Sequence, residues 1–423
     1  MTLLLGTMLV LMLLGMPVFG AMGIAAAAYL MTYDVPPVIA VQQMFAGIDS
    51  FPLLAVPFFV LAGNLMNASV ITDRIYRFAG AVCGHIRGGL GHVNIFGSLI
   101  FSGMSGTAVA DAGGLGTIEL RAMRDEGFDM RFAVGVTAAS ATLGPIIPPS
   151  LPLVVYGASA GASVGQLFLA GLVPGLLVAL CLHAMVWWIA GRRNYPRGRW
   201  PGWAEVGVRG LDALPALLTP AIILGGMMAG IFTPTEAAVV AALYALALDG
   251  LFYRRLTWVR LAGVLRDTFE TTAVIMIIVA ASTGFGWILV REGAAQQVTQ
   301  LMLAVASDPT TFMLAANLLL LFAGMFLDTI VVVLIATPLL LPAMQSFGVD
   351  PVQFGVVMVL NLMIGLMTPP VGLLLFVLSR IAGLDIWETT KGCAPFMVPL
   401  VVVLIAISVF PPLTLALPTY FFR

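Results

Sequence analysis

The sequence predicts an all-α polytopic membrane protein that consists of two inverted repeats, each with one re-entrant helical hairpin and one broken helix. Three observations carry this prediction: the composition, the positions of the basic residues, and a pair of motifs that occurs twice at one spacing. Of 423 residues, 61% are hydrophobic and 9% are charged, whereas an average soluble chain has about 25% charged residues. A helix that crosses a bilayer needs about 20 mostly apolar residues, and the chain holds about ten such stretches.

Composition also argues against several kinds of protein. The net charge is −1 and no basic tract is present, so no nucleic acid partner is expected. Cys83, Cys181 and Cys393 are isolated in apolar surroundings, which predicts neither a disulfide framework nor a CxxC metal site. The apolar N-terminus shows no evident cleavage site and is expected to remain as a membrane span.

The basic residues predict which ends of the apolar stretches face the cytoplasm, because Arg and Lys are concentrated in cytoplasmic loops. They cluster at residues 74–87, 121–131, 192–209 and 254–266, and at Arg380 with Lys391. The stretch 90–118 has a basic cluster on each side, so a hairpin that enters from the cytoplasm is predicted there. The stretch 310–346 is flanked by segments with almost no basic residues, which predicts a hairpin from the periplasm. The alternative is ten or more ordinary spans with a few badly placed arginines.

Two motifs recur with the same offset. Residues 101–104 (FSGM) match 322–325 (FAGM), and 322 − 101 = 221; residues 144–149 (GPIIPP) match 365–370 (GLMTPP), and 365 − 144 = 221. The basic clusters place the two hairpins on opposite faces, so the duplication is inverted. Inverted repeats with broken helices are the architecture of secondary transporters.

The expected repeats are residues 1–210 and 211–423. The first would hold scaffold helices, the hairpin near 90–118 and a broken helix near 132–157. The second would hold scaffold helices, the hairpin near 310–346 and a broken helix near 351–379. On this symmetry, residues 1–33 should cross the membrane twice and break at residues 15–17. Ordinary spans are expected near 51–70, 164–190, 213–232, 236–253, 268–290 and 394–417.

The paired prolines of the two broken helices predict cation sites. Proline removes a helical donor and frees the carbonyl four residues earlier, and unwound carbonyls of transporters coordinate coupling ions. The first Na+ site is expected to contain Ser102, Ser105, Gly144, Ile147 and Pro149. The second Na+ site is expected to contain Gly324, Asp328, Gly365 and Thr368. The alternative is that the small residues only allow close packing and that the hydroxyls bond to their own helices.

The substrate is expected between the two hairpin tips, with Thr107, Ser150, Thr329 and Pro370 as the contacting residues. Asp111 is an ionisable residue inside an apolar run, and its position along the hairpin suggests that it reaches water. Asp328 is equally compatible with a site residue and with a helix cap. Glu236 of residues 233–236 (TPTE) is expected to cap a helix rather than bind an ion, and the three histidines are expected to have no partner that indicates a metal site.

At this point the sequence resembles the DctM-like large membrane subunit of the tripartite ATP-independent periplasmic (TRAP) transporters. The matching stretches are 101–107 (FSGMSGT), 144–150 (GPIIPPS), 230–238 (GIFTPTEAA), 324–328 (GMFLD) and 365–372 (GLMTPPVG). The resemblance implies an elevator mechanism, coupling to inward Na+ flow, and a place in the bacterial inner membrane. It also implies a small four-helix (DctQ-like) membrane subunit and a periplasmic (DctP-like) substrate-binding protein. The implied substrates are C4-dicarboxylates, sialic acid and other sugar acids. No four-helix segment precedes Met1, so the small subunit is expected to be a separate chain.

Two other functions remain open at this stage. A stand-alone Na+/dicarboxylate symporter of related architecture would need no binding protein. A polytopic membrane enzyme would need a catalytic constellation near one face, and the sequence offers no such motif, so an enzyme is not expected. A passive channel is disfavoured because hairpins from both faces would plug a pore.

Overall fold

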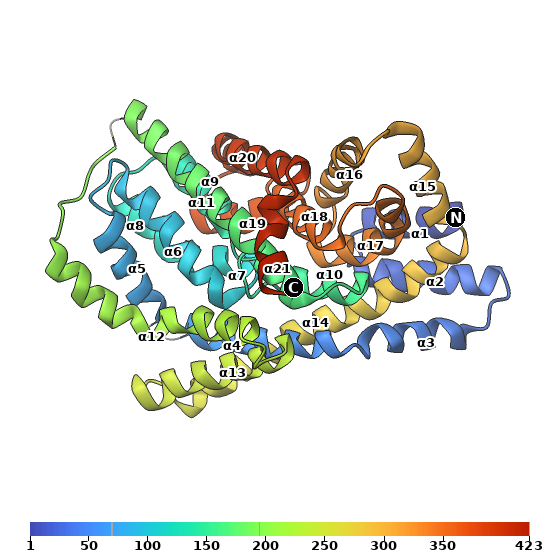
Figure 1. Cartoon of the computed structure of the whole chain (residues 1–423), viewed down its shortest axis with the longest axis horizontal. Coiled ribbons are helices and arrows are strands. Elements are labelled where there is room, and N and C mark those ends of the chain that lie inside the picture. The colour runs from blue at the N-terminus through green and yellow to red at the C-terminus, as the bar shows by residue number, and fades with distance from the viewer. Residues whose placement is uncertain (69–70, 194, 423) are drawn as a thin grey trace.

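The computed structural model describes residues 1–68, 71–193 and 195–422, and this part of the chain is helical without a strand (Figure 1). Helices dominate because backbone groups in hydrocarbon must find their partners within the chain. Six helices are long and apolar enough to cross a membrane, and a pair bent by 60° at Asp49–Ser50 makes up to seven. The prediction of an all-α polytopic protein is therefore confirmed.

The chain begins with a short helical hairpin and a bent pair of helices. The elements are α1 (Thr2–Leu13), α2 (Val18–Thr32), α3 (Pro37–Ile48), the 3-10 turn η1 (Phe51–Leu54) and α4 (Ala55–Ala68). The predicted break at residues 15–17 is confirmed, and Gly15 takes a positive φ of 85° there. Whether α1 and α2 each cross the membrane stays a prediction. Helix α3 was not expected, and it extends the scaffold beside α14.

The first hairpin and the first broken helix follow. The elements are α5 (Ile71–Cys83), α6 (Gly89–Ser105), α7 (Ala108–Gly113), α8 (Leu115–Asp125), α9 (Met130–Ala141) and α10 (Leu151–Ala160). Helices α6 and α7 are the arms of the hairpin, and the left-handed Gly106 (φ 68°) forms its tip. Helices α9 and α10 are the two halves of the broken helix. Both features occur where the sequence predicts them.

Mostly long helices occupy the middle of the chain. They are α11 (Val164–Arg193), α12 (Trp203–Met228), α13 (Pro234–Ala247) with the π-helical turn η2 (Leu248–Phe252), and α14 (Trp258–Arg291). Helix α14 packs against α3, and α13 packs against α4. In Figure 1, α12 and α13 lie along the lower edge of the view and α14 runs beside α3, whereas α11 crosses the upper left part of the molecule.

The second hairpin and the second broken helix complete the chain. The elements are α15 (Ala294–Val305), α16 (Pro309–Gly324), α17 (Thr329–Ser346), α18 (Pro351–Leu366), α19 (Leu373–Ala382), α20 (Ile386–Val409) and α21 (Pro412–Phe421). Helices α16 and α17 form the predicted hairpin, and α18 and α19 form the predicted broken helix. The span expected near 394–417 corresponds to α20, which starts earlier, at Ile386, and ends at Val409, just before Pro411 and Pro412. The boundary between the repeats stays a prediction.

The two broken helices form the centre of the core. Every residue of α18 from Val352 to Leu366 is buried, as expected for a helix that is apolar on all sides. Helix α9 packs against α20, and α18 packs against α16. Buried polar contacts join each hairpin to its broken helix: in the first repeat Asn94 donates to Thr137 (2.7 Å), and in the second Asn361 donates to the side-chain oxygen of Asn317 (3.0 Å).

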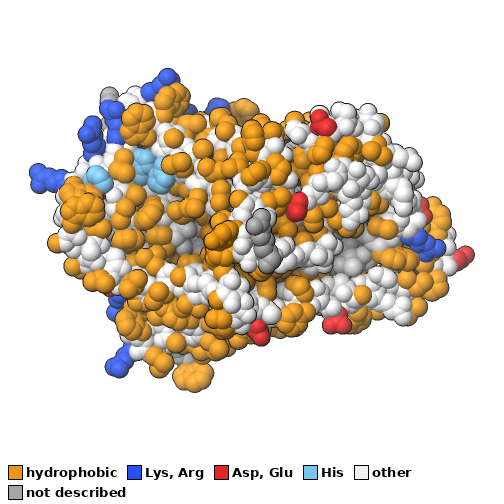
Figure 2. Space-filling view, in the orientation of Figure 1, with side chains coloured by type: hydrophobic (Ala, Val, Ile, Leu, Met, Phe, Trp, Pro, Cys, Tyr) orange, Lys and Arg blue, Asp and Glu red, His pale blue; other side chains and the backbone are white. Residues whose placement is uncertain are grey.

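The surface agrees with a membrane protein of defined orientation. Hydrophobic side chains cover most of the face shown in Figure 2, and most of its Lys and Arg side chains lie over the end formed by α5, α8 and the C-terminal end of α11. The distribution of Arg and Lys predicts that this basic end faces the cytoplasm.

Candidate functional site

The tip of the first hairpin lies directly against the break of the first broken helix. The amide of Leu151 donates to the carbonyl of Gly106 at 3.3 Å. A Cβ atom on Gly106 would lie 2.7 Å from the carbonyl oxygen of Pro149. A Cβ on Gly144 would lie 2.5 Å from Oδ2 of Asp111 and 3.3 Å from the carbonyl oxygen of Thr107. Glycine is therefore required at both positions for the two segments to approach.

Asp111 is the residue that the sequence analysis misplaced. It does not reach water: its side chain is 2% exposed. The Ser105 hydroxyl donates to Oδ1 of Asp111, and Oδ2 has no hydrogen-bond partner among the residues that the structure describes. The position along the hairpin suggested exposure because the sequence does not reveal that the break of α9 and α10 covers this arm.

The structure brings together some residues of the first expected Na+ site and separates others. Ser105, Gly144 and Pro149 meet at the hairpin tip. The hydroxyl of Ser102 instead donates to the carbonyl of Leu99 in its own helix at 2.7 Å. The side chain of Ile147 points towards α11, where it fills the space beside Gly175.

Ser150 stabilises the first break by capping α10 and by bonding to a freed carbonyl. Its Oγ accepts from the amide of Leu153 at 3.2 Å and caps α10. The same hydroxyl donates to the carbonyl of Pro145, so one of the two carbonyls that the prolines free has a partner within the chain. The carbonyl of Gly144 accepts no hydrogen bond from the described residues.

The second hairpin tip contacts the second break in a similar way. The amide of Gly372 donates to the carbonyl of Met325 at 3.3 Å, and Gly324 and Gly365 are in backbone contact. The hydroxyl of Thr368 donates to its own helix, to the carbonyl of Ile364 at 2.7 Å. The peptide bonds Pro148–Pro149 and Pro369–Pro370 are both cis.

Asp328 and Thr329 begin α17 at the second tip. Asp328 caps the helix, because its Oδ1 accepts from the amide of Ile330 at 2.9 Å. Thr329 is 5% exposed, and its hydroxyl has no partner within residues 1–68, 71–193 and 195–422. Asp328 is therefore a capping residue whose carboxylate also borders the space between the two tips.

A cavity of about 420 Å³ lies between the two hairpin tips. Thr107 and Thr329 line it, whereas Ser150 is fully buried and Pro370 is exposed outside it. The N-terminal residues of α10, α17 and α19 all contribute to its wall. The lining residues are Thr107, Ala108, Val109, Ala110, Pro145, Leu151, Pro152, Thr271, Val274, Ile275, Ile278, Asp328, Thr329, Ile330, Met363, Leu366 and Leu373.

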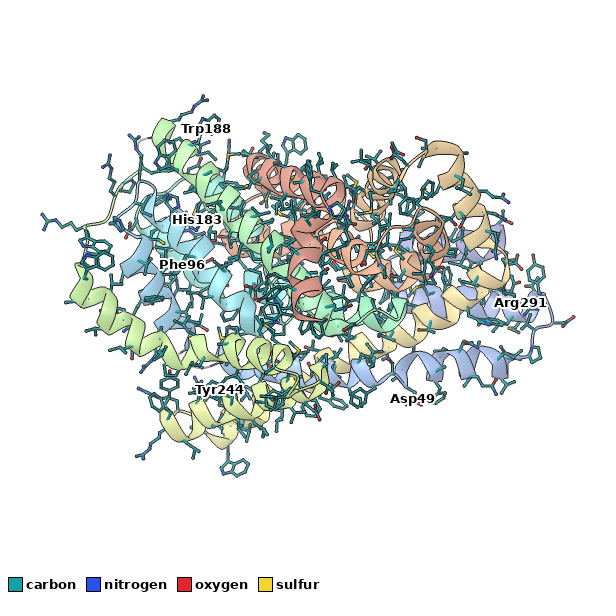
Figure 3. The ribbon with its side chains drawn as sticks, in the orientation of Figure 1. Asp49, Phe96, His183, Trp188, Tyr244 and Arg291 are labelled. Carbon is teal, nitrogen blue, oxygen red and sulfur yellow. The ribbon has the colours of Figure 1, made fainter. Side chains whose placement is uncertain are left out.

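Helix α14 forms the scaffold wall of this cavity and of a second one. The second cavity, of about 540 Å³, lies farther along α14, between α3 and α14 on one side and α10 and α17 on the other. Its lining includes Ser282 and Thr283, and Asp49 at the bend after α3 (Figure 3). The α14 residues of both cavities recur every three or four positions, from Thr271 to Val290. One face of α14 therefore lines both spaces, and nothing in the local sequence indicated this role.

The remaining candidate residues have structural explanations. Thr233 and Glu236 form the expected capping box at the start of α13: the amide and hydroxyl of Thr233 each donate to Glu236 at 2.8 Å. His92 and His183 are packed against each other, with Nδ1 of His92 2.8 Å from Nδ1 of His183, which Figure 3 labels on α11. In the described part of the chain, no three His, Cys, Asp or Glu side chains are placed to hold a metal.

Comparison with known proteins places this architecture in a family. Residues 5–413 match the family described as tripartite ATP-independent periplasmic transporter, DctM component. The chain is 47% identical, over 96% of each protein, to the sialic acid TRAP transporter large permease protein SiaM of Vibrio cholerae. It is 36% identical to the 2,3-diketo-L-gulonate TRAP transporter large permease protein YiaN of Escherichia coli, over 96% of this chain and 95% of that protein.

One further relative and one solved structure are informative. The chain is 42% identical to the sialic acid TRAP transporter permease protein SiaT of Haemophilus influenzae, over 97% of this chain and 67% of that protein. The fold is similar to the crystal structure of the YdaH transporter of Alcanivorax borkumensis, with a TM-score of 0.64 at 13% identity, over 92% and 90% of the two chains. The resemblance inferred from the motifs is confirmed. This chain belongs to the DctM component family of the tripartite ATP-independent periplasmic transporters: it is a large permease subunit, a multi-pass protein of the inner membrane and not an enzyme.

Proposed function

We propose that this subunit takes up a small organic acid, of the class that includes sialic acid, other sugar acids and C4-dicarboxylates, and that inward Na+ flow drives the uptake. Relatives with these three kinds of substrate in their names match almost the whole chain: SiaM, YiaN and, at 34% identity, the C4-dicarboxylate TRAP transporter large permease protein DctM of Rhodobacter capsulatus. All three substrate classes carry a carboxylate, so the shared requirement is an anion site within the membrane.

The cavity between the hairpin tips is the observation that carries the proposal. Helices α10 and α17 begin at its wall, with Leu151 and Thr329 as their first residues. Helix N-termini present free amides and a positive dipole end to an anion. Thr329 lines the same space, and its buried hydroxyl has no partner in the described chain. The volume of about 420 Å³ lies within the usual range for small-molecule sites.

The two tips also offer oxygen atoms that suit Na+. A hard cation prefers carbonyl, hydroxyl and carboxylate oxygens. At the first tip, these are the carbonyls of Thr107 and Pro149 and the free oxygen of Asp111; at the second, they are the Asp328 carboxylate and the Thr329 hydroxyl. The inward Na+ gradient would drive uptake when Na+ binds to these oxygen atoms. Each site would be complete only when the hairpin tip and its broken helix are in contact.

An elevator movement fits the arrangement of the cavities. Helix α14 lines both of them, so hairpins and broken helices that slide along its face would carry the substrate from one cavity towards the other. The proposal includes a small four-helix membrane subunit, held against scaffold helices near residues 1–33 and 213–253, and a periplasmic protein that delivers the acid. The scaffold is the reasonable anchor because a sliding domain cannot be the fixed one.

The test is uptake of labelled organic acids into proteoliposomes that contain this chain and its small subunit. Uptake is measured with and without a Na+ gradient, and with and without the periplasmic binding protein. We expect uptake only when both are present. Uptake that needs the Na+ gradient but not the binding protein would indicate a stand-alone symporter. Uptake that is independent of Na+ would contradict the proposed coupling to Na+ flow.

A double variant tests the site in the same assay. Ser105→Ala with Thr329→Ala removes one hydroxyl from each hairpin tip, and we expect altered Na+ and substrate dependence. Thr299→Ala is the matched control, because the Thr299 hydroxyl bonds only to its own helix α15 (2.8 Å to the carbonyl of Ala295). Unchanged dependence in the double variant would contradict the placement of the site.

A further inference from the structure

A groove of about 370 Å³ lies between α11 and α20, away from the hairpin tips. Its α11 side includes Cys181, Ala184 and Trp188, which Figure 3 labels near the C-terminal end of that helix. Its α20 side includes Val398 and Val402. These residues recur every three or four positions, so each helix contributes one face. The small side chains of Cys181 and Ala184 leave the space between the two helices hollow.

The groove faces lipid. Both of its helices are long and apolar enough to cross the membrane. Val398 and Val402 are each 55% exposed, Trp188 is 47% exposed, and none of the lining side chains is charged. Exposed apolar surface on a membrane-spanning helix lies against hydrocarbon, and a concave patch of it marks a place where a membrane component binds. An acyl chain therefore suits this groove.

One cation stands beside the end of the groove without a carboxylate partner. The Arg192 guanidinium lies 4.0 Å from the centroid of the Trp188 ring, in the last turn of α11. None of the ion pairs that the described residues form includes Arg192. Lys391, in the first turns of α20, is instead paired with Glu388 at 3.3 Å. Arg recognises phosphate through charge-assisted hydrogen bonds, and Trp and Arg are both typical of the headgroup layer.

The spacing along α11 matches the shape of a phospholipid. The helix rises about 10 Å from Cys181 to Trp188 and about 6 Å more to Arg192, at 1.5 Å per residue. One leaflet of the hydrocarbon layer is about 15 Å thick. The groove thus begins next to a cation at headgroup depth and continues through much of one leaflet. Since the end of α11 belongs to the basic end of the molecule, this is the leaflet that we expect on the cytoplasmic side.

We propose that the groove binds an anionic glycerophospholipid of the cytoplasmic leaflet. One acyl chain lies between residues 181–188 of α11 and residues 398–402 of α20, and the phosphate pairs with Arg192. A headgroup with a net negative charge is preferred, because the charge of Arg192 has no partner in the described chain. Helix α20 packs against α9, and α11 packs against α18, so the lipid is held by helices that surround the two broken helices.

The experiment uses the chain with its small subunit in phosphatidylcholine nanodiscs. A trace of phosphatidylglycerol with a photoreactive group in its acyl chain is included, and the crosslinked peptides are mapped. We expect crosslinks at residues 181–188 and 398–402. Unlabelled phosphatidylglycerol should compete with them, whereas added phosphatidylcholine should not. Arg192→Gln should lower the crosslink yield about fivefold, as expected for the loss of one cation at an anionic headgroup.

Two control variants separate a built site from general attraction. Arg266→Gln removes an exposed arginine of α14 that is paired with Glu270, and it should keep the crosslink yield. Ala184→Leu fills the groove and should lower the yield without changing any charge. Ala304→Leu makes the same change at an exposed alanine of α15, and it should have no effect.

Each other outcome counts against the inference. An unchanged yield in Arg192→Gln, or equal competition by phosphatidylcholine, would show that the groove does not select an anionic headgroup. Crosslinks that occur only without the small subunit would show that this subunit covers the groove. If Arg192→Gln does not fold, Ala184→Leu decides: a lower yield supports the lipid site, and an unchanged yield refutes it. No transport is measured, so these results leave the proposed uptake and its Na+ coupling untouched.

Discussion

Gly324 and Gly365 are in direct backbone contact where the second hairpin meets its broken helix: a Cβ on Gly365 would lie 2.7 Å from the carbonyl carbon of Gly324. The contact brings the end of α16 against the end of α18, just before the second break. It exists only because neither residue has a side chain.

We therefore expect Gly365→Ala to force the hairpin away from the break. Overpacking of this kind costs about 1–3 kcal/mol, so the melting temperature in lipid nanodiscs should fall and uptake should be largely lost. Gly263→Ala in α14 is the control, because a Cβ on Gly263 would meet no neighbouring atom within 4 Å. An equal effect of both substitutions would show that the contact with Gly324 is unimportant.

The buried asparagines should hold each hairpin to its own broken helix. Asn361 of α18 donates to both the backbone and the side-chain oxygen of Asn317 in α16, at 2.9 and 3.0 Å. Asn361→Leu leaves the buried side-chain oxygen of Asn317 without this donor, which costs about 1–3 kcal/mol. Thermal unfolding should show this loss, whereas Ser346→Ala, at an exposed site whose hydroxyl bonds to its own helix, should leave the melting temperature unchanged.

Labelling of single cysteines tests the movement along α14. In a chain whose Cys83, Cys181 and Cys393 are replaced by Ser, Thr271→Cys reports the cavity at the tips and Ser282→Cys reports the larger cavity. If the tips slide along α14, they uncover one position while they cover the other, so Na+ with substrate should change the two labelling rates in opposite directions. Two rates that do not respond at all would argue against sliding along this helix.

Substitutions in the capping box at the start of α13 distinguish two possible roles of Glu236, helix capping and Na+ binding. Thr233→Val removes the side-chain cap and should lower the free energy of unfolding by about 1 kcal/mol. Glu236→Gln can still accept from the amide of Thr233, so the Na+ concentration for half-maximal uptake should not change. A large rise in that concentration would make Glu236 an ion ligand after all.

Local signals allowed the hairpins and broken helices to be predicted from the sequence. The adjacent prolines at 148–149 and at 369–370 disrupt helical hydrogen bonding, and Gly106 and Gly15 permit turns with positive φ. The positions of the basic residues then distinguished hairpins from ordinary spans. The assignment of Glu236 to a cap succeeded for the same reason, since a capping box lies within four residues.

The parts that could not be predicted depend on contacts between distant segments. Asp111 looked accessible because nothing in α7 shows that the first break covers it. Thr271 could not be identified from the sequence, because it lines the cavity only through the position of α14 opposite both hairpin tips. Ser102 was expected at a Na+ site, but a hydroxyl in an apolar helix can bond to its own backbone equally well, and it does so here.

Helix α14 is unbroken over 34 residues, and so it is about 51 Å long at 1.5 Å per residue, whereas the hydrocarbon layer is about 30 Å thick. Its first turns carry Arg260, Arg266 and the exposed Trp258, which are residue types that favour the headgroup layer. Its later turns form the wall of both cavities. A continuous helix of this length is stiff, so in the proposed elevator movement a force applied to its end in the headgroup layer would be transmitted to the wall of both cavities.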